Sequence, residues 1–440
     1  MVKLIILFLM MSLSAWADSE VKLSYHYALA ADECDSMSVW DISMQMCMPL
    51  PMADMPMSML MLHGNAFLVG TTEQGARGHD IIGSVNMFMA DLGTSLGDRH
   101  YLNLDFMGTA ELWTLPTRGY SELLQVGESD AHGNPFIDAQ HPHSSPVMGL
   151  TLSDTIKLDT GGEKDHLKVF FAPRGETTDG PIAFMHRPTG VANPDAPLGH
   201  HIGQDVGHIT STVFGASLKQ GDTRIEVSTF SGLEPVPTKI DLPMGTPNSF
   251  AVRLIEEFTP SIMAMASAAY IQNPEPSDPS TPFVARYSAS LYTRHELGGF
   301  LTGWQLYNSF IFGLILKYDH ANSLASFGEE FWMHHDRSRI FGRIEVLERT
   351  PDELMVDTLP GGVPLVASNP TVNPTVGRWV TAATLGYTHA LVQFAHEGEL
   401  ALGSSVSKDF LPDVFQGAYG GNPWTAKVFL QLNGMKMWDL

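Results

Sequence analysis

Segments in which polar and apolar side chains alternate are the feature that most constrains how this chain can fold. Successive side chains of a β-strand point to opposite faces, so such a segment predicts a strand with one apolar and one polar face. Residues 101–112 alternate in this way, and residues 339–349 and 426–432 repeat the pattern. Alternating segments of about ten residues are typical of strands that cross a bilayer with their apolar face toward lipid.

The connections between the alternating segments are alternately short and long. Short turns are predicted at residues 92–98, 159–164, 219–222, 258–261, 294–299, 334–338 and near Val392. Longer connections are predicted at residues 71–78, 113–143, 174–205, 232–247, 272–281, 310–320, 351–375 and 406–423. Outer-membrane barrels have short periplasmic turns, longer extracellular loops and an even number of strands. We therefore predict an all-β fold, a transmembrane antiparallel β-barrel of about 16 strands with both termini on the periplasmic side.

The chain is expected to divide into three parts. Residues 1–17 have the pattern of a signal peptide, with a basic start, an apolar run and a small-residue cleavage site. Residues 18–56 form a Met-rich periplasmic leader, and residues 57–440 form the barrel. Such a barrel belongs in the outer membrane of a Gram-negative bacterium, with membrane lipid as its partner. A formal net charge of −23 without a basic cluster argues against nucleic acid.

The leader is rich in sulfur. Its two cysteines, Cys34 and Cys47, are the only ones in the sequence, and an oxidising compartment favours a disulfide between them. A pair of thiolate metal ligands is the alternative. Residues 37–61 also hold nine of the 24 methionines. Thioethers select soft ions such as Cu(I), although methionine is also a flexible apolar filler.

The first predicted strand, residues 57–70, continues this methionine pattern. Met57, Met59, Met61 and His63 share one face, and leucines occupy the other. If the leucines face lipid, the methionines form a ladder that faces the lumen and ends at a histidine. The ladder is either a set of soft-metal ligands or plain packing in the lumen.

Two long connections concentrate histidines. Residues 181–210 carry His186, His200, His201 and His208, and residues 136–145 carry His141 and His143. Residues 181–210 hold too much proline and glycine for a helix or strand, and His141 and His143 lie beside prolines. Long ordered loops are usually functional. These imidazoles can gather around a metal ion, or they can serve as hydrogen-bonding struts. Their spacing matches no zinc-finger or HExxH pattern.

Several motifs resemble those of a family of uncharacterised bacterial outer-membrane barrel proteins. They are a Met/His entry at residues 61–64, QHPH at 140–143, AFMHRP at 183–188, GHH at 199–201 followed by His208, and a closing strand at 428–432. The resemblance implies the fold and the location but no activity. The leader is also similar in composition to copper resistance protein B. The chain departs from that protein in having Leu62 between Met61 and His63, and almost no histidine in the leader.

These patterns predict a barrel that binds or transports soft metal ions, with copper or silver as the candidate. The expected ligands are Met57, Met59, Met61, His63, His141, His143, His186, His200, His201 and His208. The alternative is a passive porin for small solutes, with the long loops constricting its pore. A minor alternative is a hydrolase in which His143 is the base and the neighbouring Ser144 or Ser145 is the nucleophile.

Overall fold

The computed structural model describes most of the chain after residue 57. The described residues are 38–41, 46–49, 58–143, 146–162, 164–274, 281–317, 323–356, 358–359, 363–364, 373–394 and 398–440. The predicted signal peptide, Cys34, Met57, Ser144 and Ser145 lie outside them, and the side chain of Cys47 is not described. Predictions about these residues remain predictions. Within the leader, strand β1 (Ser38–Asp41) pairs with strand β2 (Met46–Pro49).

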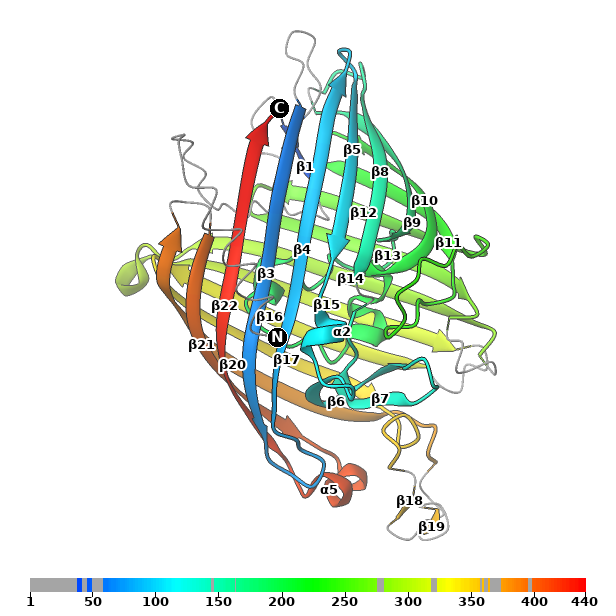
Figure 1. Cartoon of the computed structure of the whole chain (residues 1–440), viewed down its shortest axis with the longest axis vertical. Coiled ribbons are helices and arrows are strands. Elements are labelled where there is room, and N and C mark those ends of the chain that lie inside the picture. Colours follow the sequence, from blue (N-terminus) through cyan, green and yellow to red (C-terminus); the bar gives the residue numbers. More distant parts are fainter. Residues whose placement is uncertain are drawn as a thin grey trace.

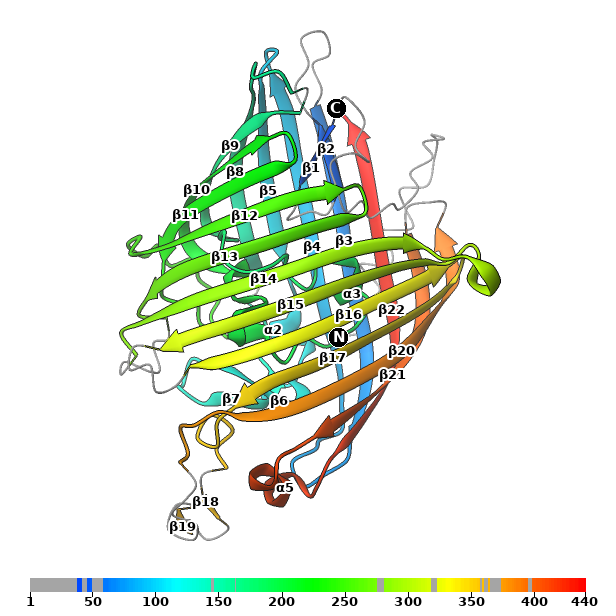
Figure 2. The same cartoon turned by 180° about the vertical axis from the view of Figure 1, so that it is seen from behind.

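Sixteen antiparallel strands close into one barrel (Figures 1 and 2), which confirms the predicted fold class. Around the barrel, the strands follow chain order. They are β3 (Ser58–Glu73), β4 (Ile81–Leu96), β5 (His100–Gly108), β8 (Val147–Lys157), β9 (His166–Gly175), β10 (Thr210–Gln220), β11 (Thr223–Ser231), β12 (Ser249–Thr259), β13 (Ile262–Gln272), β14 (Phe283–Glu296), β15 (Gln305–Lys317), β16 (Leu324–His335), β17 (Ser338–Arg349), β20 (Arg378–Phe394), β21 (Gly398–Phe410) and β22 (Trp424–Asp439). The barrel closes where β22 pairs with β3, from Thr425 opposite Glu73 to Asp439 opposite Met59.

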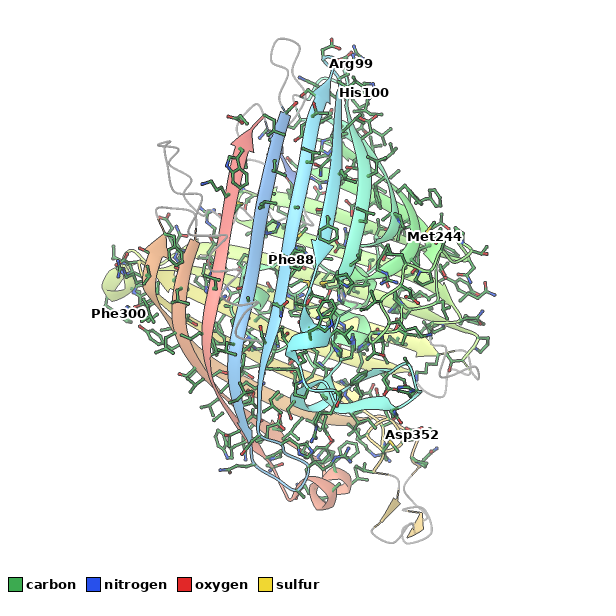
Figure 3. The ribbon with its side chains drawn as sticks, viewed as in Figure 1. Phe88, Arg99, His100, Met244, Phe300 and Asp352 are labelled. Atoms are coloured by element: carbon green, nitrogen blue, oxygen red, sulfur yellow. The ribbon has the colours of Figure 1, made fainter. Side chains whose placement is uncertain are left out.

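The predicted alternation of short and long connections is present around most of the barrel. It fails at β15, where the connection from β14 (residues 297–304) is longer than the connection to β16 (residues 318–323). Turns of two residues join β10 to β11 and β12 to β13, whereas more than thirty residues separate β5 from β8 and β9 from β10. The C-terminus and the β4–β5 turn, marked by Arg99, lie at one end of the barrel, and Asp352 of a long connection lies at the other (Figures 1 and 3). The long connections also carry helix α5 (Asp413–Tyr419) and the hairpin of β18 (Thr358–Leu359) and β19 (Val363–Pro364), and the short helix η4 (Gly299–Leu301) lies in the β14–β15 turn.

The wall has the two faces that the sequence predicts. On β22, Val428 is 61% exposed on the outside, whereas its neighbours Lys427 and Phe429 face inward and are buried. Leu62 and Leu68 of β3 likewise face outward. No helix among the described residues is long and apolar enough to cross a membrane. A closed sheet with an apolar exterior satisfies its backbone internally, as a bilayer requires. The chain is therefore an outer-membrane β-barrel.

Several predicted boundaries are wrong. Strand β20 continues to Phe394, past the turn expected near Val392, and strand β21 continues to Phe410, into the connection expected at 406–423. The strand expected at 101–112 ends at Gly108, and a short helix, α2 (Glu111–Thr114), follows it. The loop expected at 310–320 is strand up to Lys317. Residues 310–316 are apolar on both faces, because their inward side packs against other lumenal side chains, and this hides the alternation that marks a strand.

Two long connections fold back into the barrel and form what we call the plug, residues 109–143 and 176–209. It contains α2, the hairpin of β6 (Tyr120–Ser129) and β7 (Pro135–Gln140), and the short helical turns α3 (Pro188–Val191), η2 (His200–Gln204) and η3 (Val206–His208). Figures 1 and 2 show α2, α3, β6 and β7 within the barrel outline. Nearly every described side chain from Thr177 to His208 is buried.

Charged side chains of the wall hold the plug. Arg187 of the plug makes a two-pronged ion pair with Glu330 of β16, at 2.7 and 2.9 Å. Arg349 of β17 donates to the backbone oxygens of Leu124 and Leu198, at 2.9 and 2.6 Å, and so ties both parts of the plug to one strand. Buried charges are costly unless they are paired, so these contacts favour one position of the plug.

Candidate metal centre

The β6–β7 hairpin positions the first two histidines. Asp138, on β7, accepts hydrogen bonds from the Leu124 backbone at 2.9 Å and from the Tyr419 hydroxyl of α5 at 2.7 Å, and it pairs with Arg77 at 2.5 Å. These contacts hold the hairpin against the barrel. The chain then turns through a proline, so His141 and His143 project from a short segment that follows β7 directly.

The second part of the plug supplies the other histidines. The turn η2 lies on the lumenal face of β15 and β16, where Ser326 donates a 2.7 Å hydrogen bond to the Ile202 carbonyl oxygen. Gly203, with a φ of 72°, reverses the chain there, which a residue with a Cβ rarely does. The reversal brings the His208 ring back to the His200 ring, with centroids 5.0 Å apart.

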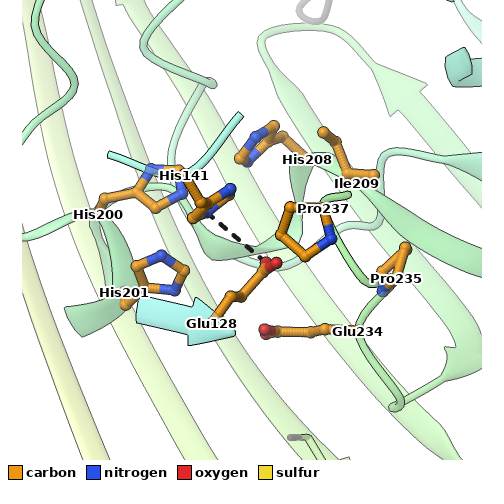
Figure 4. A pocket seen from close by; sticks show the side chains of 9 residues that line it. All are labelled: Glu128, His141, His200, His201, His208, Ile209, Glu234, Pro235 and Pro237. Carbon is orange, nitrogen blue, oxygen red and sulfur yellow. Dashed lines mark ion pairs between the residues drawn. The ribbon is translucent and has the colours of Figure 1, made fainter. Parts of the chain in front are cut away.

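Five histidines of the two stretches converge, and Figure 4 shows four of them, His141, His200, His201 and His208. The distances between ring centroids are 4.5 Å for His200–His201, 5.0 Å for His200–His208, 5.4 Å for both His141–His201 and His143–His208, 5.9 Å for His141–His143 and 6.1 Å for His141–His200. We call this group the histidine cluster, His141, His143, His200, His201 and His208.

Two overlapping triads, one of which adds Asp205 to the histidine cluster, bring enough ligand atoms together to hold a metal ion. The ligand atoms of His141, His200 and His201 lie within 4.8 Å of one another, as do those of His200, Asp205 and His208. Two atoms that each bind one ion at about 2.0–2.1 Å lie at most about 4.2 Å apart, so a bound ion would draw the ligand atoms of each triad together. His200 belongs to both triads, so the cluster offers either one site with a choice of ligands or two adjacent positions.

Hydrogen bonds from Nδ1 to nearby carboxylate or carbonyl oxygens fix the orientation of three of the histidine rings. Nδ1 of His143 lies 2.7 Å from a carboxylate oxygen of Glu111, Nδ1 of His208 lies 2.7 Å from the Asp205 carbonyl oxygen, and Nδ1 of His141 lies 3.2 Å from the Pro142 carbonyl oxygen. If Nδ1 carries the proton in each ring, the Nε2 lone pair remains for a metal ion. Metal-binding histidines regularly donate their other ring nitrogen to an oxygen in this way.

Burial also keeps these imidazoles neutral. It lowers the pKa of His141 to about 4, and it lowers the pKa of His200, His201 and His208 well below the ordinary value. Burial has the opposite effect on the Asp205 carboxyl, whose pKa it raises. Because a metal ligand must be deprotonated, the four rings are in the binding form at neutral pH.

The cluster opens toward a small cavity with acidic walls. Glu128 and Glu234 line this cavity beside four of the histidines (Figure 4). A carboxylate oxygen of Glu128 lies 3.7 Å from Nε2 of His141. Carboxylates in the wall of a low-dielectric cavity attract cations and repel anions.

The structure brings some predicted ligands together and separates others. His186 is buried near enough to contribute to the lowered pKa of His208, but it belongs to neither triad. Met59, Met61 and His63 face the lumen as predicted, but they lie on β3 of the wall. Sequence reasoning missed Asp205, Glu111, Glu128 and Glu234. Of these four, only Asp205 could have been found from the sequence, because it lies between His201 and His208. Glu111 was expected on a barrel strand.

We expect the free energy of unfolding of the plug to fall as the pH drops from about 6.5 toward 4. Unfolded His141 binds its proton near pH 6.5, but folded His141 does so only at about 4, so acid favours the unfolded loop. For His141 alone the difference corresponds to roughly 3 kcal/mol. His200, His201 and His208 act in the same direction, and Asp205 acts in the opposite one.

Hydrogen exchange of residues 176–209 in metal-free protein, corrected for intrinsic rates, measures this effect. The barrel strands serve as the internal control and should keep their protection. Plug protection that is equal at pH 7 and pH 4.5 would contradict the prediction.

Fold and site together define a class, an outer-membrane β-barrel whose lumen holds a plug with a buried histidine cluster. No family model matches the sequence, and no curated protein does. Among solved structures, the chain is similar to OprB of Pseudomonas putida, with a TM-score of 0.49, 11% identity, and coverage of 87% of this chain and 94% of that one. It is also similar to the anion-selective porin from Comamonas acidovorans (TM-score 0.47, 10% identity, 86% and 99% covered) and to OmpT of Vibrio cholerae (0.46, 8%, 87% and 99%). Similarities this distant carry no argument about what this barrel binds.

Proposed function

We propose that this barrel binds a transition-metal ion at the histidine cluster and carries the ion across the outer membrane, with copper as the best candidate. One observation supports this proposal above the others. Five imidazoles from separate stretches converge in a buried site, and three of them present Nδ1 to an outer oxygen. Histidines that serve only as struts need no such convergence.

The donor set favours copper among the ions that imidazole accepts. Imidazole suits Zn, Cu, Ni and Fe, whereas thioether sulfur suits Cu(I). The same lumen contains buried methionines on β3, β4, β5 and β8. Copper is the ion in that set for which both donor types are suitable, as Cu(II) on imidazole and as Cu(I) on sulfur.

In this proposal, each group of residues has a role that follows from its position. Glu128 and Glu234 concentrate cations in the cavity beside the cluster. His141, His200, His201 and His208 replace the hydration shell of the ion, with Asp205 as an oxygen donor. Glu111 orients His143, which lies on the side of the cluster that faces a second cavity.

Replacing His200 and His208 together by glutamine tests the proposal. The change removes the ligand shared by both triads and one further ligand, so we expect Cu(II) affinity to fall at least about 100-fold, since loss of an outer-shell partner alone costs 10–100-fold. Purified, folded full-length protein is titrated with Cu(II) by calorimetry and electron paramagnetic resonance. His295→Gln, which changes an exposed histidine at the end of β14, is the matched control and should bind as wild type does.

Equal copper binding by the double variant and the wild type would overturn the proposal. Wild-type protein that fails to bind copper but lets small neutral solutes into liposomes would favour the porin alternative.

A further inference from the structure

We propose a second metal site in this lumen, built from thioether sulfur and one imidazole on the barrel wall, which takes Cu(I) or Ag(I). Four residues form one row across four adjacent strands: Met435 of β22, His63 of β3, Met89 of β4 and Met107 of β5. In the sheet register, Met435 is opposite His63, His63 is opposite Met89, and Met89 is opposite Met107. Directly paired side chains on one face are within contact distance, so we call these residues the Met–His row.

The row joins two clusters of buried methionines. Met87, Met89, Met107 and Met148 form one cluster, and Met59 and Met61 form the other, with Met435 and Met437 packed against it. His63 lies between them, since its partners on the two sides are Met435 and Met89. Met89 and Met107 are buried on the lumenal face, and the half-buried His63 and Met435 lie on the same face by strand register.

The concentration of sulfur here is not general lumenal packing. The three other buried clusters consist mainly of Phe, Tyr, Leu, Ile, Val and Ala, with Met263 and Met265 as the only methionines among their described buried members. In this sector, by contrast, every fully buried member is methionine. Methionine serves well as filler, but filler has no reason to replace the other apolar residues in one sector alone.

The state of the His63 side chain indicates that a ligand binds here. Its Nε2 atom is buried and has no hydrogen-bond partner among the described residues. A buried polar atom left without a partner is unfavourable, and a bound cation would satisfy it. The next row toward the short-turn end places Met437 opposite Met61 and Met61 opposite the buried Asp91, whose carboxylate favours a positive ion nearby.

The chemistry of the row selects the ion. Thioethers with one imidazole form a soft, neutral donor set, which suits Cu(I) and Ag(I) and disfavours Zn(II) and Cu(II). A second cavity is lined by Glu111 and His143 of the first site and also by Met87 and Met185. This arrangement deepens the proposed function, on which its place in a transport path rests. The ion that moves is Cu(I), which imidazole also binds, and it passes from the imidazoles to the sulfur atoms along one side of the lumen without a change of oxidation state.

The test uses Ag(I), which takes the Cu(I) position without redox chemistry. Met89, Met107 and Met435 are all changed to leucine, which conserves volume but removes three sulfur atoms. We expect the folded full-length triple variant to bind one equivalent of Ag(I) less than wild type in calorimetric titration, and X-ray absorption to show fewer silver–sulfur bonds. Met263→Leu with Met265→Leu, two buried lumenal methionines elsewhere in the barrel, is the matched control and should bind as wild type does.

A triple variant that is folded and keeps the wild-type Ag(I) stoichiometry would overturn the second site. The His200→Gln and His208→Gln variant separates the two proposals, because it should lose Cu(II) but retain Ag(I) on the row. If wild type binds Ag(I) on the row but no Cu(II) on the cluster, the first proposal fails and the second stands. A His63→Gln variant with unchanged Ag(I) affinity would remove the imidazole from the site and contradict the row as we describe it.

Discussion

Replacing Gly313 by alanine should displace the histidine-bearing turn and abolish high-affinity copper binding while the barrel stays closed. Gly313 faces the lumen on β15, and a Cβ atom there would lie 1.9 Å from the Ile202 carbonyl oxygen and 2.8 Å from the Gly203 carbonyl carbon. Backbone this close has no flexible end that could move aside, so η2 must move as a whole. Overpacking typically costs about 1–3 kcal/mol, and here the cost falls on the turn that carries His200 and His201.

A neighbouring glycine provides the matched control. A Cβ atom on Gly328 of β16 would meet the Gln204 side-chain amide at 3.0 Å, and the end of a flexible side chain can shift. Cu(II) titration should therefore show near-wild-type affinity for Gly328→Ala and at least about a hundredfold loss for Gly313→Ala, as expected when several ligands move. Equal effects in the two variants would show that the turn does not depend on its contact with Gly313.

Replacing Glu330 by glutamine should release the plug from its most heavily charged anchor. Glu330 accepts from Arg187 at 2.7 and 2.9 Å, from Thr189 at 2.9 Å and from Arg343 at 3.0 Å. All of these groups are buried, so the variant leaves two guanidinium groups without their common counter-ion. Breaking a buried pair in this way costs about 3–5 kcal/mol.

The expected results are faster hydrogen exchange in residues 176–209 and a larger ion conductance in planar bilayers. Arg99→Ala removes an exposed ion pair with Asp159 at a turn and should change neither measurement, because exposed pairs contribute about 0–1 kcal/mol. Conductance and exchange that match wild type in Glu330→Gln would mean that the other contacts suffice to hold the plug.

Much of the barrel could be predicted because its pattern is local. Alternation identifies each strand from its own residues, as at 339–349, where arginines point inward and isoleucines outward. The same reasoning fails where both faces are apolar, which is why residues 310–317 were expected to be a loop. It also fails at α2, because the strand before it ends when the chain leaves the wall to enter the lumen.

The histidines of the candidate site could be predicted from the sequence, but the contacts between them could not. The histidines stood out by their density in two stretches. Which of them meet depends on how two distant loops fold into one lumen, and no local pattern encodes that. The pairs Met87 and Met89 or Met435 and Met437 had the same two-residue spacing as Met59 and Met61, yet their alignment into one row depends on strand register.

The Met–His row is complete only when the barrel closes, at the pairing of β3 with β22, which we call the seam. Met435 and His63 are neighbours only through that seam, and 372 positions of sequence separate them by their residue numbers. Contacts between the two ends of a chain are the last to be gained, because closing so large a loop costs the most entropy and slows folding. A nascent or half-inserted barrel therefore has no complete row with which to capture a toxic ion. The ability to hold silver becomes a chemical signature of finished assembly, and a bound ion would fasten the seam in the membrane.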